Sequence, residues 1–186
     1  MTQIEHPKMK IFGLVGWSGS GKTTLLIRLL PVLISRGLTV STMKHGHHRF
    51  DVDSPGKDSY RHRDAGATEV LVASSRRWAL MHELRDSPEP SMENLVRHMT
   101  PVDLLLVEGY KAAGHDKLEV HREAVNEDPI FPGDSTIVAV ASDRPNLNAQ
   151  IPWFDLDDPD AIAGFILAHC KLLTSVEQEV LDATGG

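Results

Sequence analysis

The segment of residues 11–30 constrains the fold of this chain more than any other. Its apolar start, Ile11–Val15, predicts a buried strand, and residues 24–30 predict a helix. Between them lies G-W-S-G-S-G-K-T, residues 16–23, which matches G-x-x-x-x-G-K-[ST] at every fixed position. A glycine-rich turn without a ligand is the alternative. However, a strand, a glycine loop and a helix in this order direct backbone N–H groups and the helix dipole at one point. The sequence therefore predicts a P-loop that binds a polyphosphate.

The residues of this loop have different expected roles. Lys22 would reach the terminal phosphates and act in catalysis, and the Thr23 hydroxyl would ligate Mg²⁺. The other expected nucleotide contacts are Gly16, Trp17, Ser18, Gly19, Ser20, Gly21 and Thr24.

A second candidate site residue ends the most apolar stretch of the chain. Residues 102–107 predict a buried strand, and Glu108 follows it. An acid at the end of a strand beside the P-loop strand can hold Mg²⁺ or its water. Asp103 is a rival, but it begins the strand, roughly 17 Å away and near the edge of the sheet where ligands do not gather. We assign Glu108 to catalysis and metal binding, with a chance surface acid as the alternative.

Apolar runs alternate with helical patterns along the chain, which is typical of a parallel sheet with crossover helices. We expect an α/β, P-loop NTPase-like fold, with a mostly parallel sheet and helices on both faces. Residues 117–122 alternate weakly and predict an edge strand or arm, and the fold class allows an edge hairpin or arm. One P-loop domain, residues 10–173, would follow an extension of residues 1–9 and precede a tail of residues 174–186, either a frayed helix or disordered.

The other expected elements come from shorter patterns. Strands are predicted at residues 38–43, 68–73, 77–81, 136–141 and 153–155, and helices at 58–65, 92–99 and 158–173. Ser91 is the expected N-cap of the helix at 92–99. A turn at Ser74 and Ser75 would join the two strands at 68–73 and 77–81.

Composition excludes several classes of protein. No apolar run approaches the ~18 residues that a membrane-spanning helix needs. The net charge of −7 argues against a nucleic-acid surface, which requires a basic stripe. Cys170 is the single cysteine, which excludes an intramolecular disulfide and an all-cysteine zinc site and fits a reducing compartment. Because residues 1–8 carry no apolar signal region, we expect a cytoplasmic protein.

A polar loop with three histidines, His45, His47 and His48, follows the strand predicted at 38–43. Three interpretations remain open: a surface loop, a contact with phosphate or substrate, and ligation of a transition metal. Adjacent histidines in a regular strand diverge, which disfavours a shared ion. Arg61 and Arg63 continue the same rim and would either pair with phosphate or form a solvated helix face. We count His47 and Arg61 among the candidate nucleotide contacts.

Asp143 is the candidate for base recognition, because it follows the apolar strand at residues 136–141. GTP-binding P-loop proteins place an aspartate after such a strand, where it accepts hydrogen bonds from guanine N1 and N2. The usual pattern is Asn-Lys-x-Asp, and this chain keeps only the aspartate. Recognition of GTP and capping of a helix both remain open for Asp143.

Five further motifs carry a family resemblance. They are K-H-x-H-H from Lys44, D-x-D-x-P-G-K-D-S from Asp51, A-G-A from Ala65, R-W-A-L-M from Arg77 and L-V-E-G-Y-K from Leu106. With the P-loop, the chain closely resembles the molybdopterin-guanine dinucleotide biosynthesis adaptor family (protein B) over roughly residues 10–170.

The resemblance implies a P-loop fold of the signal-recognition/MinD-like class and a GTP-binding homodimer with weak GTPase activity. It also implies a supporting role beside the nucleotidyltransferase that joins GMP to molybdopterin. One position departs from MinD-like relatives, because Trp17 stands where they carry a signature lysine.

Two other functions fit the same residues. A small-molecule kinase would use the P-loop with an acceptor pocket near Glu108, but such kinases usually carry an arginine-rich lid. A metallochaperone GTPase would use the histidine loop, but it would normally carry cysteines too. Since no general base or arginine finger is evident, we expect slow GTP hydrolysis without a partner. The expected ligands are Mg²⁺ and GTP, and the expected partners are the nucleotidyltransferase and molybdopterin, without nucleic acid or membrane.

Overall fold

A computed structural model describes residues 9–46, 50–144 and 150–173. Residues 1–8 of the predicted extension and the whole predicted tail, residues 174–186, lie outside the described residues. The chain forms two compact units, Met1–His45 with Thr100–Gly186, and Gly46–Met99. We call the first the sheet unit and the second the hairpin unit, and we describe each by itself. The proposed boundaries of a single P-loop domain at residues 10–173 stay a prediction.

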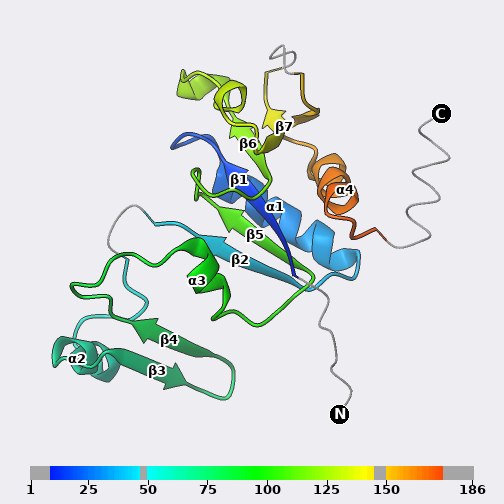
Figure 1. Ribbon diagram of the computed structural model, residues 1–186. Helices are drawn as coiled ribbons and strands as arrows, with labels where there is room; N and C mark the ends of the chain where they lie inside the picture. The colour runs from blue at the N-terminus through cyan, green and yellow to red at the C-terminus, as the bar shows by residue number, and fades with distance from the viewer. Residues whose placement is uncertain (1–8, 47–49, 145–149, 174–186) are drawn as a thin grey trace. The chain divides into compact units, whose positions relative to one another are not determined.

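Six parallel strands build the sheet unit (Figure 1). They are β1 (Lys10–Val15), β2 (Val40–Lys44), β5 (Leu104–Glu108), β6 (Lys117–His121), β7 (Ile137–Ser142) and β8 (Trp153–Asp155). Their order is β2-β5-β1-β6-β7-β8, and each neighbouring pair is parallel. The predicted parallel α/β fold is confirmed, and the P-loop strand β1 lies beside β5 as expected. Every residue of β5 is buried, which explains why its sequence is a nearly continuous apolar run.

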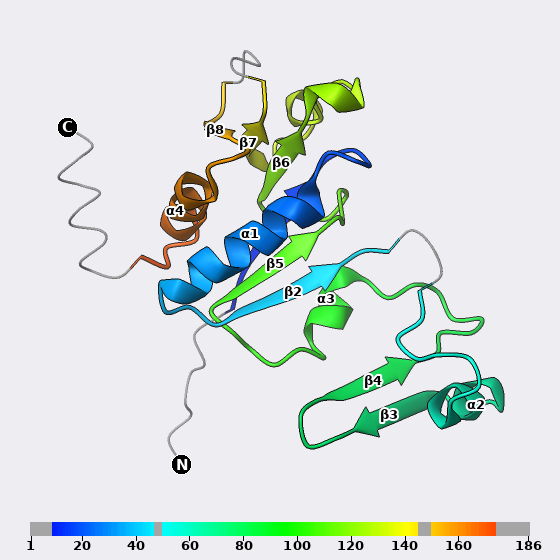
Figure 2. The same cartoon turned by 180° about the vertical axis from the view of Figure 1, so that it is seen from behind.

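Two helices, α1 (Lys22–Ser35) and α4 (Pro159–His169), cover one face of this sheet (Figure 2). Both contribute to one hydrophobic core with alternate residues of the strands. Its helical members include Leu25, Leu29, Leu33, Ile162 and Ile166, all fully buried. This packing anchors α1 and thereby holds its N-terminus at the end of β1. At α4 the side chain of Asp158 accepts a hydrogen bond from the backbone N of Ala161.

The prediction of an edge strand or arm at residues 117–122 is wrong. β6 lies inside the sheet between β1 and β7, and all five of its residues are buried. Two of its polar side chains, those of Lys117 and Glu119, are paired within the fold. The Lys117 ammonium donates to the Ala113 carbonyl at 2.6 Å and to the Thr136 hydroxyl. Burial lowers the pKa of Lys117, against the opposing charge of Asp134. The weak alternation therefore reflects buried polar side chains and not an exposed edge.

Glu119, also on β6, forms hydrogen bonds with the loop segment that follows β6, on the sheet face opposite α1 and α4. Its carboxylate accepts hydrogen bonds from the backbone N atoms of Ile130 at 2.9 Å and Phe131 at 2.8 Å. This segment includes two short 3₁₀ turns, η1 (Glu123–Val125) and η2 (Phe131–Gly133). It also reaches the P-loop, because the Trp17 indole N–H donates to the Asp128 carbonyl at 2.8 Å.

The hairpin unit contains α2 (Asp58–Asp64), β3 (Glu69–Ala73), β4 (Trp78–His82) and α3 (Met92–Val96). β3 and β4 pair antiparallel, and the Ser74 hydroxyl closes their turn by accepting from the backbone N of Arg77. The Ser91 side chain caps α3 by accepting from the backbone N of Asn94, as predicted. No helix among the described residues is long and apolar enough to cross a membrane.

Candidate functional site: a P-loop with an acidic strand end

Two glycines give the P-loop its path. Gly16 leaves β1 with φ at 148°, and a Cβ there would lie 2.3 Å from the Val120 carbonyl oxygen. Gly21 precedes α1 with φ at 96°, in the left-handed region that suits glycine. Any side chain at Gly16 would collide with β6, and one at Gly21 would strain the backbone. The loop therefore needs glycine at both positions to pass between the sheet and the helix.

Lys22 folds back over this loop. Its ammonium donates to the carbonyl oxygens of Gly16 at 3.0 Å and Trp17 at 2.8 Å. Burial lowers the pKa of Lys22, the charges of Lys111 and Lys44 act in the same direction, and Glu108 opposes them. The lysine predicted to reach phosphate thus lies against the loop, with two further cations close by.

The next residue of the motif connects the loop to β5. The Thr23 hydroxyl donates a hydrogen bond to Glu108 Oε1 at 2.7 Å. Lys44 Nζ lies 2.9 Å from the same Oε1 and donates to the Thr23 hydroxyl at 3.2 Å. Glu108 is buried, with 7% of its surface exposed. These three side chains form a closed triangle that we call the Thr23 triad.

Strand register explains why these residues meet. Glu108 is the Cα partner of Leu14 on β1 and of Lys44 on β2. All three positions lie at the carboxyl ends of parallel strands, where ligands of such sheets gather. Asp103 lies at the other end of β5, where its carboxylate accepts from the Thr39 hydroxyl at 2.6 Å. The prediction that Asp103 occupies the wrong edge is confirmed.

The donor atoms of this loop suit a magnesium–polyphosphate ligand. The Thr23 hydroxyl and the Glu108 carboxylate supply hard oxygen atoms, which Mg²⁺ prefers. The Ser20 hydroxyl is buried and has no hydrogen-bond partner in the part of the chain that the structure describes. A phosphate oxygen would satisfy such a group, since a buried polar atom is costly without a partner.

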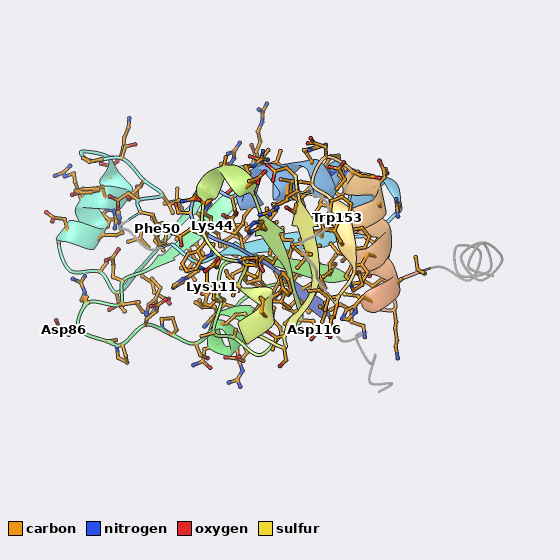
Figure 3. The ribbon with its side chains drawn as sticks, turned by 90° about the horizontal axis from the view of Figure 1, so that it is seen from above. Lys44, Phe50, Asp86, Lys111, Asp116 and Trp153 are labelled. Atoms are coloured by element: carbon orange, nitrogen blue, oxygen red, sulfur yellow. The ribbon has the colours of Figure 1, made fainter. Side chains whose placement is uncertain are left out.

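Sequence reasoning missed two of the cations around the loop, Lys111 and Arg122. The Lys111 ammonium lies 4.1 Å from the centre of the Trp17 ring (Lys111 and Lys44 are labelled in Figure 3). An Arg122 guanidinium nitrogen lies 3.6 Å from the position that a Cβ on Gly21 would take. Each follows a strand or turn that is remote from the P-loop in sequence. Only the strand order, with β1 between β5 and β6, could reveal their proximity.

Asp143 lies directly after β7, as predicted, and its carboxylate has protein partners. Oδ1 accepts from the backbone N of Glu123 at 3.0 Å, and Oδ2 lies 3.6 Å from the Arg122 guanidinium. Asp143 therefore holds the start of η1 beside the arginine that approaches Gly21. Its predicted contact with guanine stays a prediction.

The similarity of this chain to known proteins agrees with the geometry of the P-loop. Residues 11–143 match the family described as MobB, molybdopterin guanine dinucleotide synthesis protein B. The chain belongs to the MobB family. The molybdopterin-guanine dinucleotide biosynthesis adapter protein of Escherichia coli (strain K12) is 42% identical over 84% of this chain and 91% of its own length. The corresponding adapter protein of Haemophilus influenzae is 40% identical over 86% of this chain and 88% of its own length.

A crystal structure of molybdopterin-guanine biosynthesis protein B, also of this family, has the same fold. Its TM-score is 0.66 at 30% identity, over 86% of this chain and 99% of that chain. The resemblance to the MobB family and the P-loop NTPase-like fold expected from the sequence are thus confirmed.

The structure describes some of the other candidate residues of this MobB-family chain and not others. His45 lies after β2, and its ring centre is 4.7 Å from that of Tyr110. His47 and His48 lie outside the described residues. Within the described residues, no group of three histidine, cysteine or acidic side chains is placed to hold a metal ion. Arg61 lies on α2 of the hairpin unit, 3.8 Å from Asp58, and its predicted phosphate contact stays a prediction.

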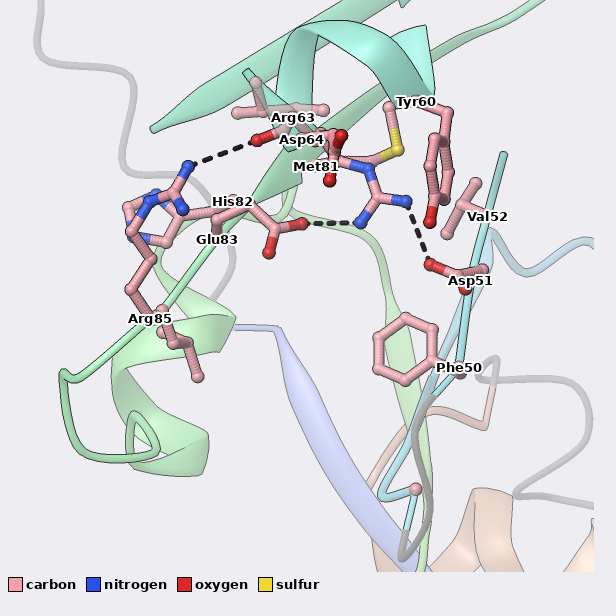
Figure 4. A pocket seen from close by; sticks show the side chains of 13 residues that line it. Phe50, Asp51, Val52, Tyr60, Arg63, Asp64, Met81, His82, Glu83 and Arg85 are labelled. Carbon is pink, nitrogen blue, oxygen red and sulfur yellow. Dashed lines mark hydrogen bonds and ion pairs between the residues drawn. The ribbon is translucent and has the colours of Figure 1, made fainter. Parts of the chain in front are cut away.

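Arg63, the other arginine proposed for phosphate, is engaged within the hairpin unit. Its guanidinium donates to Glu83 at 2.7 Å and to Asp51 at 2.9 Å (Figure 4). It also donates to Asp53 at 2.6 Å. The hydrogen bonds to Glu83 and Asp53 raise the pKa of Arg63. With three carboxylates around it, Arg63 organises this unit and has little capacity for a further anion.

The same cluster borders a hollow of about 860 Å³ within the hairpin unit. Phe50 and Tyr60 supply aromatic walls, and Leu80, Met81 and Leu84 supply aliphatic ones. Phe50 is 77% exposed, so its ring is accessible from solvent.

Proposed function

We propose that this protein is a GTP-binding adapter in the synthesis of molybdopterin guanine dinucleotide, assisting a nucleotidyltransferase and hydrolysing GTP only weakly. The observation that carries the nucleotide-binding part is the hydrogen bond from Thr23 to Glu108 at the P-loop. Membership of the MobB family supports the adapter role over a small-molecule kinase or a metallochaperone GTPase.

The loop amides and Lys22 would neutralise the phosphates, and Thr23 with Glu108 would hold Mg²⁺. Bound Mg²⁺ would supply charge neutralisation at the β- and γ-phosphates. Glu108 would orient an attacking water, but a candidate general base and an arginine finger were not evident in the sequence. We therefore propose slow intrinsic hydrolysis that a partner accelerates.

Binding of GTP is tested by calorimetry with wild type and Lys22→Ala. A lost charge-assisted contact should weaken GTP binding about 10- to 150-fold. Lys10→Ala is a matched control, because Lys10 is exposed and begins β1 at the opposite end from the loop. Equal affinities of wild type and Lys22→Ala would refute the P-loop assignment.

The adapter role is tested by reconstituting dinucleotide synthesis at limiting GTP, with a nucleotidyltransferase and molybdopterin. Wild type should increase the yield of dinucleotide cofactor, and Lys22→Ala should not. We propose that the histidines His45, His47 and His48 contact the transferase or its pterin, with Asp53, Lys57 and Arg61 of the hairpin unit as further candidate contacts. A His47→Ala/His48→Ala variant that binds GTP and stimulates normally would rule out the two histidines as contacts.

A homodimer is the proposed assembly. The β3–β4 hairpin supports it, because Leu71, Leu80 and Trp78 share one face of the hairpin and are 60%, 45% and 66% exposed. Exposed apolar faces of this kind often mark protein interfaces. Sedimentation of wild type and Trp78→Ser tests the proposal, and a monomeric wild type would contradict it. The single cysteine, Cys170, supports a reducing compartment such as the cytoplasm.

A further inference from the structure

Lys44 holds a position that nothing in the P-loop motif requires. Its ammonium contacts Glu108 Oε1 at 2.9 Å and the Thr23 hydroxyl at 3.2 Å. These are the two groups that would hold Mg²⁺. The backbone of Lys44 is fixed by its register with Glu108 at the end of β2, whereas its side chain is 61% exposed. The ammonium group can therefore move while the backbone of Lys44 stays at the edge of the site.

An ammonium and a divalent cation compete for the same oxygens. When Mg²⁺ is held by Thr23 and Glu108, like charges within a few ångströms repel, so Lys44 must turn to another anion. The terminal phosphate of a bound triphosphate is the strongest acceptor at this edge, because three charged oxygens accept hydrogen bonds there. A diphosphate leaves the γ-phosphate position empty, and its terminal β-phosphate would already be engaged by the loop amides and Lys22. Lys44 would then keep competing with Mg²⁺ for Thr23 and Glu108.

The neighbouring cations have other partners. Lys22 donates to two loop carbonyls, Lys111 covers the Trp17 ring, and Arg122 lies beside Asp143. Among the described residues that surround the loop, Lys44 alone contacts both members of the pair Thr23 and Glu108.

We propose that Lys44 is a specificity-determining residue that recognises the γ-phosphate and makes the site favour GTP over GDP. The proposal rests on the proposed binding of Mg²⁺ and GTP. Lys44 exchanges the Glu108 carboxylate for the terminal phosphate, so the triad responds to the phosphate chain as well as to the metal.

The test measures dissociation constants by calorimetry for GDP and for a non-hydrolysable GTP analogue, both with Mg²⁺. Lys44→Met removes the charge and keeps the length of the side chain. Lys10→Met makes the same change in charge at the far end of the sheet. The preference for the triphosphate over GDP should fall about tenfold or more in Lys44→Met and stay unchanged in Lys10→Met. GDP binding in Lys44→Met should equal or exceed that of wild type.

Two results overturn the proposal. The first is an unchanged preference for the triphosphate in Lys44→Met, and if both nucleotides bind more weakly there, the lysine acts by general electrostatics. The second is an equal fall of the preference in Lys10→Met. Lys44→Arg, which keeps a cation, should retain more of the preference than Lys44→Met. If Lys44→Met unfolds, Lys44→Gln provides the same comparison. Wild type that binds neither nucleotide refutes the proposed function as well, whereas binding that depends on Lys22 but not on Lys44 refutes this inference alone.

Discussion

The Thr23 hydroxyl donates a hydrogen bond to the Glu108 carboxylate over 2.7 Å, although 85 residues separate them in the chain. The contact joins the first turn of α1 to the carboxyl end of β5. It places a hydroxyl and a carboxylate, two oxygen ligands that Mg²⁺ accepts, beside the glycine loop.

Glu108→Gln should lower GTP hydrolysis at least tenfold and raise the Mg²⁺ concentration that hydrolysis needs, because the amide carries no charge. The melting temperature should change by only a few degrees, since the amide oxygen still accepts from Thr23 and the exposed Lys44 remains solvated. Steady-state hydrolysis and thermal unfolding measure both effects. Asp103→Asn, on the same strand at the opposite edge, should leave hydrolysis unchanged. A large loss of stability in Glu108→Gln with normal hydrolysis would mean that the residue is structural.

Gly16→Ala should destabilise the protein more than Gly19→Ala. Both glycines have positive φ, at 148° and 80°, but only the added Cβ at Gly16 meets backbone, the Val120 carbonyl at 2.3 Å. We expect Gly16→Ala to lower the free energy of unfolding by about 3 kcal/mol or more, and Gly19→Ala by about 1 kcal/mol. Chemical denaturation measures the difference. Equal losses in the two variants would show that the close approach to β6 has no energetic consequence.

Asp143 substitutions should separate base recognition from loop support. Asp143→Ala removes both the acceptor for the Glu123 backbone N and the charge, whereas Asp143→Asn keeps an acceptor. If the carboxylate recognises guanine, both variants lower the ratio of GTP to ATP affinity, because only a carboxylate accepts from N1 and N2 together. Competition binding with the two nucleotides measures this ratio. An unchanged ratio in Asp143→Asn, with a lower melting temperature in Asp143→Ala, would limit Asp143 to holding η1.

Stability should depend on pH through Asp103. Hydrogen bonds from the Thr39 hydroxyl and backbone N lower the pKa of Asp103. A carboxyl group with a lowered pKa stabilises the fold above its unfolded pKa of about 3.9, and this contribution is lost as the pH falls through the folded value. Asp103→Asn should therefore cost about 1 kcal/mol near neutral pH and much less near pH 3. Denaturant titrations at both pH values measure the difference, and an equal cost at both would contradict the assignment.

Several features of this protein follow from local sequence alone. The P-loop is recognisable because its glycines, Lys22 and Thr23 lie together in residues 16–23. The spacing within this short segment is enough to assign each residue its expected role. Glu108 is identifiable because it directly follows the apolar run of residues 104–107, and such a run predicts a strand inside a parallel sheet.

Other features depended on the tertiary structure because their partners are distant in sequence. Lys117 and Glu119 suggest an exposed strand until Thr136, Ile130 and Phe131 are seen to satisfy them. The order β2-β5-β1-β6 decides which cations reach the loop. It places Lys44 beside Glu108 through a strand register that no local sequence pattern predicts. The phosphate-binding loop was thus determined by residues that are adjacent in the chain, and the charges around it by the pairing of strands, whose hydrogen bonds join segments far apart in sequence.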